Sequence, residues 1–327
     1  MAAAPAGGGR AELAPSVWRR LAPRAAIRRG GLSQRPATTG GGLDSECCSF
    51  LPSLRPMASQ WQNFLRNLGD WRGSFTSLSP AGEILDTTPS ILTLENGAPG
   101  AGDGVEERLV RFRLRRYAHG FDQEPTRDFS QDYRSLGRQV VFFDSGSFCK
   151  GSLQVAPNTP FGAEFGFVHG DRRHRLVQLY EASGDFDGLV LIREFRAGSD
   201  AAERPPLSLA ALQGAWHGQA GTVLADWPEI ETAEAEAHFA PSGAGGLRLR
   251  TRIGREESEL EAPGQARLQW LADGGYTLMP PQVSHRQAFT VEAGWLSGPD
   301  RLERLIRRYD ASGAWQSAAH LVLSRRA

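Results

Sequence analysis

The chain has 327 residues, a formal net charge of zero at pH 7 and an apolar fraction of 40%. This length predicts two domains of roughly 150 residues each once any processed segment is removed. The balanced charge argues against a nucleic-acid partner or an acidic membrane surface, and the sequence has no run of about 18 apolar residues that would suit a transmembrane helix. Three cysteines are too few for a disulfide framework.

Residues 1–56 differ in composition from the rest of the chain. Alanine, glycine, serine, proline and arginine dominate them, and only Glu12, Asp44 and Glu46 are acidic. This composition is typical of an organellar transit peptide and lacks the continuous apolar core of a secretory signal. We therefore expect a disordered, cleaved segment that directs the protein to the plastid stroma, with mitochondrial import as the main alternative. A second alternative is a disordered tail that precedes the true start of the protein at Met57.

The first part of the remaining chain begins with a helical pattern and continues with strand patterns. Apolar residues between Trp61 and Leu68 follow helical spacing, and the run Gly69-Asp70-Trp71-Arg72-Gly73 comes directly after them. Over 110–115, apolar residues alternate with arginines, which predicts a strand. Further strands are predicted over 139–143, 152–155, 163–168, 173–180 and 188–195, between short turn sequences.

The second part of the chain repeats the first. Gly214-Ala215-Trp216-His217-Gly218 matches the earlier glycine–tryptophan run, and 304–313 matches 175–184 with six of ten residues identical. Glu164 and Glu292 also correspond, each two residues before a glycine–aromatic pair. A repeat of this length is a duplicated domain rather than a solenoid unit. We expect one domain over 57–196, a linker rich in Gly, Ser and Pro over 197–206, and a second domain over 207–327.

Many short strands without helical crossovers predict an all-β fold with minor helix, built as two tandem antiparallel β-barrels. A short helical turn, a Gly-x-Trp that opens the first strand and a meander that ends in an arginine-bearing strand resemble the lipocalins and the wider calycin superfamily. The resemblance implies that Trp71 and Trp216 plug the closed ends of the barrels. It also implies that an arginine packs across each indole, either Arg193 or Arg196 in the first copy and either Arg325 or Arg326 in the second.

More narrowly, residues 57–327 resemble a cyanobacterial and plastid family with two lipocalin-like barrels, the domain-of-unknown-function 3598 family. The stretches 61–94, 164–184 and 191–206 carry this resemblance. It implies no activity. Bilin lyases share the superfamily, so a role connected with tetrapyrroles is an analogy based on fold alone.

Candidate ligand-binding residues lie in three places. The run from His169 to Arg175, which includes Arg173, would bind a carboxylated or phosphorylated ligand, or would form a solvated hairpin tip. Glu164 would anchor a ligand inside the barrel or form a structural ion pair. Arg111 and Arg113 would line a cavity if they face inward, and a solvated face if they face outward. Tyr180, which ends the repeated Arg-Leu-Val-x-x-Tyr pattern, completes the set.

Other kinds of site are not indicated. The histidines and cysteines lack metal-binding spacing, and neither a Gly-x-Ser-x-Gly elbow nor a phosphate-binding loop occurs. We therefore predict no metal site and no catalytic residue, and we expect Cys149 to pack as a small apolar side chain.

Three functions remain open at this stage. The leading hypothesis is a barrel that binds a small hydrophobic ligand, such as a tetrapyrrole, a carotenoid or a lipid. The second is a non-enzymatic scaffold or assembly factor for a photosynthetic complex, whose barrels would be filled by side chains. The third is a bilin-lyase-like chromophore transferase. No protein partner is identified.

Overall fold

The computed structural model describes residues 58–97, 108–227 and 229–325. The predicted transit peptide, Met57 and Arg326 lie outside these ranges. The first copy of the repeat contains α2 (Gln60–Leu65), β1 (Gly69–Leu78), β2 (Ile84–Asn96), β3 (Val110–Arg116), β4 (Arg127–Tyr133), β5 (Val140–Phe142), β6 (Phe148–Gly151), β7 (Phe161–His169), β8 (Arg172–Tyr180) and β9 (Phe186–Arg196).

The second copy contains the same elements and one additional short helix. They are α3 (Leu209–Leu212), β10 (Gly214–Leu224), β11 (Glu231–Ser242), the 3₁₀ helix Gly243–Gly245, β12 (Gly246–Ile253), β13 (Glu256–Ala262), β14 (Arg267–Trp270), β15 (Gly275–Met279), β16 (Phe289–Gly298), β17 (Arg301–Tyr309) and β18 (Trp315–Arg325). Between β9 and α3 the chain forms neither helix nor strand.

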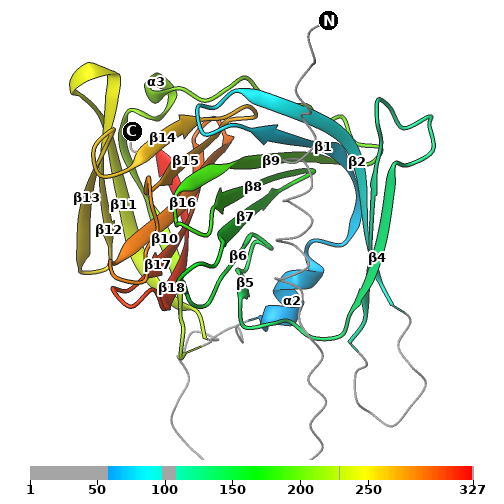
Figure 1. Ribbon diagram of the computed structural model, residues 1–327, viewed down its shortest axis with the longest axis horizontal. Coiled ribbons are helices and arrows are strands. Elements are labelled where there is room, and N and C mark those ends of the chain that lie inside the picture. Colours follow the sequence, from blue (N-terminus) through cyan, green and yellow to red (C-terminus); the bar gives the residue numbers. More distant parts are fainter. Residues whose placement is uncertain (1–57, 98–107, 228, 326–327) are drawn as a thin grey trace, which may run out of the picture.

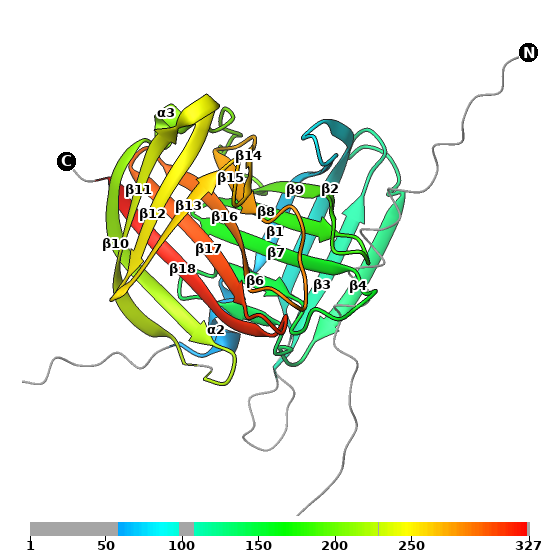
Figure 2. The ribbon, with the colours of Figure 1, turned by 60° about the vertical axis from the view of Figure 1, so that its left-hand side comes forward.

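Each copy forms one nine-stranded antiparallel sheet (Figure 1). The strand orders are β4-β3-β2-β1-β9-β8-β7-β6-β5 and β13-β12-β11-β10-β18-β17-β16-β15-β14, so the two topologies are identical. The first sheet curves into a half-barrel, here called barrel 1, and the second into a nearly closed barrel, called barrel 2 (Figure 2). The predicted all-β fold with an internal duplication is confirmed.

The helix α2 covers the short strand at one edge of the first sheet. Ser59 begins the helix with a capping box that it shares with Gln62. The side-chain amide of Gln60 donates to the carbonyl of Phe142 (3.0 Å) and accepts from the amide of the same residue (2.7 Å). These bonds satisfy backbone groups of β5 that no neighbouring strand reaches, which protects this edge from pairing with another chain.

The strands β7 and β8 are buried on both faces, because one face lines barrel 1 and the other packs against the second copy. Phe161, Phe165 and Phe167 belong to a hydrophobic core that both copies share, whereas Glu164 points into barrel 1. Because neither face meets water, these strands lack the strict alternation of apolar and polar residues that β3 shows.

The two copies pack against each other through corresponding residues. The ring of Phe161 lies 5.5 Å from that of its counterpart Phe289, and the ring of Phe167 lies 6.1 Å from that of its counterpart Trp295. Backbone bonds are paired in the same way, with Val155 donating to Gly313 (2.8 Å) and the corresponding Val283 donating to Gly184 (2.9 Å). The copies are therefore related by an approximate two-fold axis, as the subunits of a symmetric dimer would be.

One predicted strand is wrong. Residues 152–155 form no strand within their own sheet, because β6 ends at Gly151. Gln154 instead makes an isolated bridge to Ala314 of the second copy. Val155 of this segment packs in the core that the copies share, which a local sequence pattern does not reveal.

Candidate functional site

The closed end of each barrel has the tryptophan and arginine expected from the lipocalin resemblance. The indole N–H of Trp71 donates to the carbonyl of Asn67 (3.0 Å), and that of Trp216 donates to the carbonyl of Leu212 (2.8 Å). The guanidinium of Arg196 lies 4.4 Å from the ring of Trp71, and that of Arg325 lies 4.4 Å from the ring of Trp216. Arg325 also donates to the carbonyl of Ala211 in α3 (2.6 Å), and Arg196 donates to the carbonyl of Leu68, between α2 and β1 (3.2 Å).

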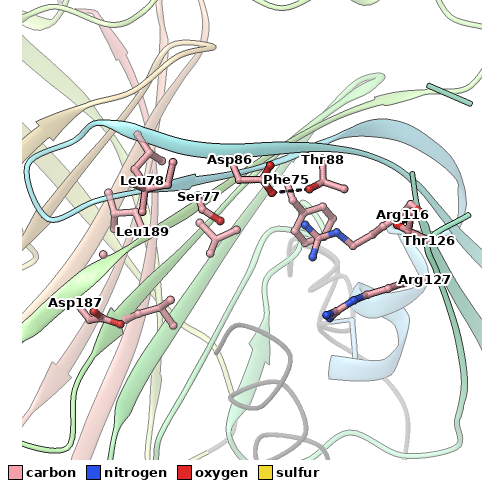
Figure 3. A pocket seen from close by; sticks show the side chains of 14 residues that line it. Phe75, Ser77, Leu78, Asp86, Thr88, Arg116, Thr126, Arg127, Asp187 and Leu189 are labelled. Carbon is pink, nitrogen blue, oxygen red and sulfur yellow. Dashed lines mark hydrogen bonds between the residues drawn. The ribbon is translucent and has the colours of Figure 1, made fainter. Parts of the chain in front are cut away.

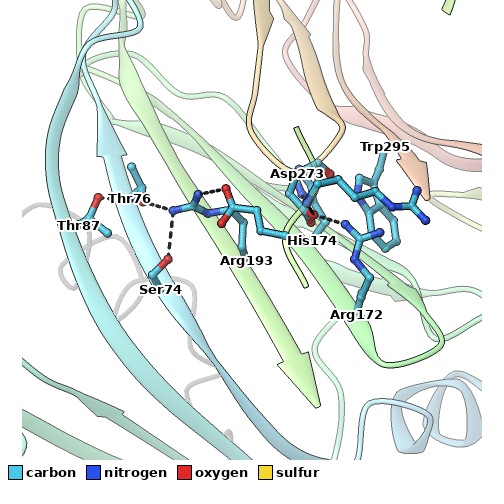
Figure 4. Close-up of polar contacts among 10 residues, drawn as sticks. Ser74, Thr76, Thr87, Arg172, His174, Arg193, Asp273 and Trp295 are labelled. Atoms are coloured by element: carbon cyan, nitrogen blue, oxygen red, sulfur yellow. Dashed lines mark hydrogen bonds and ion pairs between the residues drawn. The ribbon is translucent and has the colours of Figure 1, made fainter. Parts of the chain in front are cut away.

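Arg193, the alternative candidate for the first plug, has a different role. Adjacent residues of a strand face opposite sides of the sheet, so Arg193, an odd number of positions from Arg196, faces away from Trp71. Its guanidinium donates to the hydroxyls of Ser74 (3.1 Å) and Thr76 (2.8 Å) and pairs with Glu203 (2.6 Å) on the outer face (Figure 4).

A network of ion pairs crosses the interior of barrel 1. Arg175 makes two hydrogen bonds to Glu194 (3.0 and 2.9 Å) and one to Glu164 (3.0 Å), and all three side chains are buried. Arg173 lies 3.4 Å from Glu194 and 5.1 Å from the ring of Trp71. Burial lowers the pKa of Arg173 to about 10 and raises the pKa of Glu164. The network neutralises the candidate residues Glu164, Arg173 and Arg175 within the barrel.

Barrel 2 keeps one part of this network and replaces the rest with apolar side chains. Arg304 makes two hydrogen bonds to Glu292 (2.8 and 2.9 Å), to which the hydroxyl of Tyr276 also donates (2.8 Å). Leu302 and Leu323 occupy the positions that correspond to Arg173 and Glu194. The glutamates that recur in the sequence are therefore halves of a repeated, buried ion pair.

The densest polar cluster of the sequence is divided between three environments. His169 and Asp171 lie exposed at the hairpin tip, whereas Arg173 and Arg175 point into barrel 1. Arg172 and His174 face the second copy, where both pair with Asp273 and lie against Trp295 (Figure 4). Burial lowers the pKa of His174, although Asp273 opposes this effect. The run therefore forms neither a single ligand site nor a solvated tip as a whole.

Tyr180 lies outside barrel 1. Its hydroxyl donates to the carbonyl of Pro280 in the second copy (3.0 Å), and its ring packs against Phe161 at 5.5 Å. This candidate ligand-binding residue therefore holds the two copies together.

The arginines Arg111 and Arg113 face outward, on the opposite side of β3 from Phe112 and Leu114, which pack in barrel 1. They line a hollow of about 410 Å³ on the outer face of β1–β4, together with Asp70, Arg72, Glu95, Arg115 and Asp132. Arg113 pairs with Asp128 at 2.6 Å. Of the two alternatives for this arginine ladder, the outward one is correct.

A second hollow, of about 200 Å³, lies at the open end of barrel 1 and was not anticipated (Figure 3). Phe75, Arg116 and Arg127 line it. One signal in the sequence was available: Arg115 and Arg116 are consecutive, and consecutive strand residues face opposite sides, so one of them had to point inward.

Within 58–97, 108–227 and 229–325, no group of three or more His, Cys, Asp or Glu residues could hold a metal ion. No helix in the same ranges is long and apolar enough to cross a membrane. Cys149 is buried in the core shared by the copies, where the guanidinium of Arg307 lies 3.6 Å from its sulfur. Burial raises the pKa of this thiol.

Comparison with known proteins adds to this geometry. The family model described as "Domain of unknown function (DUF3598), N-terminal" matches residues 57–199. The crystal structure of a protein of unknown function from the DUF3598 family of Nostoc punctiforme has 35% sequence identity to the chain, a TM-score of 0.73, and coverage of 83% of this chain and 100% of that one. The chain belongs to the DUF3598 family. A second model, "Biogenesis factor required for ATP synthase 1, C-terminal domain", matches residues 203–326 of this DUF3598 member.

More distant solved structures give no further support. A putative outer membrane protein from Bacteroides fragilis (8% identity, 82% of this chain and 100% of that chain) has a TM-score of 0.24. An S-type phycobiliprotein lyase from Guillardia theta (10% identity, 83% of this chain and 94% of that chain) has a TM-score of 0.18. Both scores are too low to carry an argument. No curated protein matches the chain.

Proposed function

We propose that this DUF3598-family protein is a non-enzymatic assembly factor that acts in the biogenesis of ATP synthase in the plastid stroma. The observation that carries the proposal is the match of residues 203–326, which span all of barrel 2, to the C-terminal domain of a biogenesis factor required for ATP synthase. The composition of residues 1–56 supports the plastid location.

The filling of the barrels supports assembly over transport of a large ligand. Arg304, Glu292 and Tyr276 occupy the middle of barrel 2 among tightly packed apolar side chains. The ion pairs of Arg175 cross barrel 1. The hollow at its open end, about 200 Å³, is smaller than the roughly 300–1,000 Å³ of sites for drug-sized ligands. A tetrapyrrole or carotenoid would need these interior side chains to move apart.

The outer face of barrel 1 supplies a docking surface suited to another protein. Its hollow is lined by Arg72, Arg111, Arg113 and Arg115 together with three carboxylates, a mixture of charges that favours polar contacts with a protein over binding of an apolar ligand. In barrel 2 the corresponding arginines Arg248 and Arg250 pair with Glu261 and Glu259, and in barrel 1 Arg113 pairs with Asp128. We propose that the hollow of barrel 1 contacts the assembling complex.

The test is genetic and uses the full chain in its source organism. Disruption of the gene should lower the amount of assembled ATP synthase on native gels while other photosynthetic complexes remain at normal levels. The wild-type chain should restore assembly, and the variant Arg111→Glu/Arg113→Glu should not.

The internal duplication provides a matched control. Arg248→Glu/Arg250→Glu makes the same charge changes at corresponding positions of barrel 2 and should restore assembly. Normal ATP synthase in the disrupted strain would refute the assembly role. If both variants restored assembly equally, the docking surface would be refuted and the assembly role would stand.

A further inference from the structure

The open end of barrel 1 combines an apolar wall with two arginines. The side chains of Phe75, Leu179 and Val190 face the hollow of about 200 Å³ at the opposite end of β1 from Trp71. Arg116 and Arg127 are directly opposite each other on β3 and β4, and Figure 3 shows both side chains directed into the hollow. The site therefore offers apolar surface and positive charge side by side.

The two arginines lack hydrogen-bonding carboxylates. The guanidinium of Arg116 lies 4.9 Å from the ring of Phe75, and its buried Nε has no hydrogen-bond partner. Among the described residues, no ion pair joins Arg116 or Arg127 to an acidic side chain. Burial and the neighbouring charge of Arg127 lower the pKa of Arg116, and the charge of Asp86 offsets this effect only in part. Like charges directly opposite each other on neighbouring strands are destabilising, and a bound anion would relieve this repulsion.

Asp86 and Asp187 also line the hollow, and neither forms an ion pair with Arg116 or Arg127. Asp86 accepts a hydrogen bond from the hydroxyl of Thr88 (2.8 Å). Asp187 lies at the opposite end of the hollow from Arg127 in Figure 3. The charge of Asp86 therefore offsets part of the positive charge next to Phe75, and the two arginines leave a net positive charge there.

Barrel 2 shows that the fold does not require this arrangement. The strand registers place Ala220, Ile253 and Glu256 at the positions of Phe75, Arg116 and Arg127. Ala220 is buried in the core of barrel 2, and Ile253 packs against it. The pair of opposed arginines, with Arg116 over an aromatic ring, is therefore a property of barrel 1 alone.

We propose that the mouth of barrel 1 binds a small amphipathic anion. Arg116 and Arg127 hold a carboxylate or a phosphate, for which guanidinium groups provide paired donors, and Phe75, Leu179 and Val190 contact the apolar part of the ligand. This site goes beyond the proposed assembly role and does not depend on it.

The test is isothermal titration calorimetry of the full chain with octanoate, octyl phosphate, octanol and inorganic phosphate as probes. We expect octanoate, octyl phosphate or both to bind, and octanol and inorganic phosphate to bind at least tenfold more weakly than the better of them. The preferred head group then identifies the ligand as a carboxylate or a phosphate.

Substitutions locate the site. Arg116→Gln and Arg127→Gln should each weaken binding of the preferred probe tenfold or more. Arg127 is exposed, so its variant remains informative if Arg116→Gln unfolds the protein. The control Arg308→Gln removes the arginine that pairs with Glu256 at the mouth of barrel 2 and should leave binding unchanged. The proposal is overturned if neither anion binds, or if octanol or inorganic phosphate binds as tightly as the preferred anion. It is also overturned if Arg127→Gln binds like the wild type.

Discussion

Replacing Arg304 with methionine should destabilise the protein strongly, because it leaves the carboxylate of Glu292 buried without a cation. The side chains of Arg304 and Glu292 are only 1% and 7% exposed, and two hydrogen bonds join them. Breaking a buried pair by removing one partner costs about 3–5 kcal/mol. The remaining bond from Tyr276 to Glu292 does not supply the lost charge.

The double variant Arg304→Met/Glu292→Met distinguishes loss of packing from loss of charge compensation. Removing both charges is expected to restore roughly 2 kcal/mol or more of the loss, since paired apolar replacements are often close to neutral. The recovery is incomplete because the hydroxyl of Tyr276 then lacks its acceptor, at a cost of about 1–3 kcal/mol.

The assay is urea unfolding followed by tryptophan fluorescence, with the free energy of unfolding compared across the wild type, both single variants and the double variant. A positive coupling between the two sites supports the argument. A double variant that is as unstable as Arg304→Met alone would refute it, because packing rather than charge would then account for the whole loss.

Three further predictions concern other positions of the two sheets. A Cβ at Gly73 or Gly218 would overlap the backbone carbonyl of the neighbouring strand, so each alanine variant should lose about 1–3 kcal/mol of unfolding free energy, whereas Gly243→Ala, with open space around it, should be nearly neutral in thermal melts. Burial alone would raise the pKa of Glu303, but His320 and Arg301 lower it to about 2. The carboxylate therefore stabilises the fold at pH values above its ordinary pKa, and this contribution is lost as the pH falls towards 2. Urea titrations should find Glu303→Gln about 3 kcal/mol less stable than the wild type near neutral pH. A difference in stability that persists at pH 2 would show that the ionised carboxylate is not its cause. Finally, burial of Cys149 should prevent its alkylation in the native protein, so that peptide mapping detects the modification only after urea is added.

The sequence predicted most of the individual strands of the first copy, because local periodicity directly reports which residues face a core. The alternation over 110–115 identified β3, and the repeated glycine–tryptophan run identified the start of β1 and β10. It failed at residues 152–155, where Gln154 bridges to Ala314 of the other copy and Val155 packs in the shared core. Interfaces between domains leave no local period in the sequence.

The candidate site was harder to predict than the fold. The inward position of Arg173 and Arg175, and their pairing with Glu164 and Glu194, depend on strands that are adjacent only in space. Arg116 and Arg127 are eleven positions apart in the sequence and become direct neighbours through the β3–β4 register. A long insertion or a one-residue slip would have separated them.

The sequence by itself determined the duplication, the all-β class and the glycine–tryptophan runs that open the first strand of each copy, because each depends on residue type and spacing along the chain. Only the tertiary structure decided which arginines are buried, which carboxylates neutralise them, and that one barrel is filled while the other keeps a charged hollow at its mouth. Charge compensation and cavity volume depend on distances between strands, and these distances arise only after the sheets have closed and packed together.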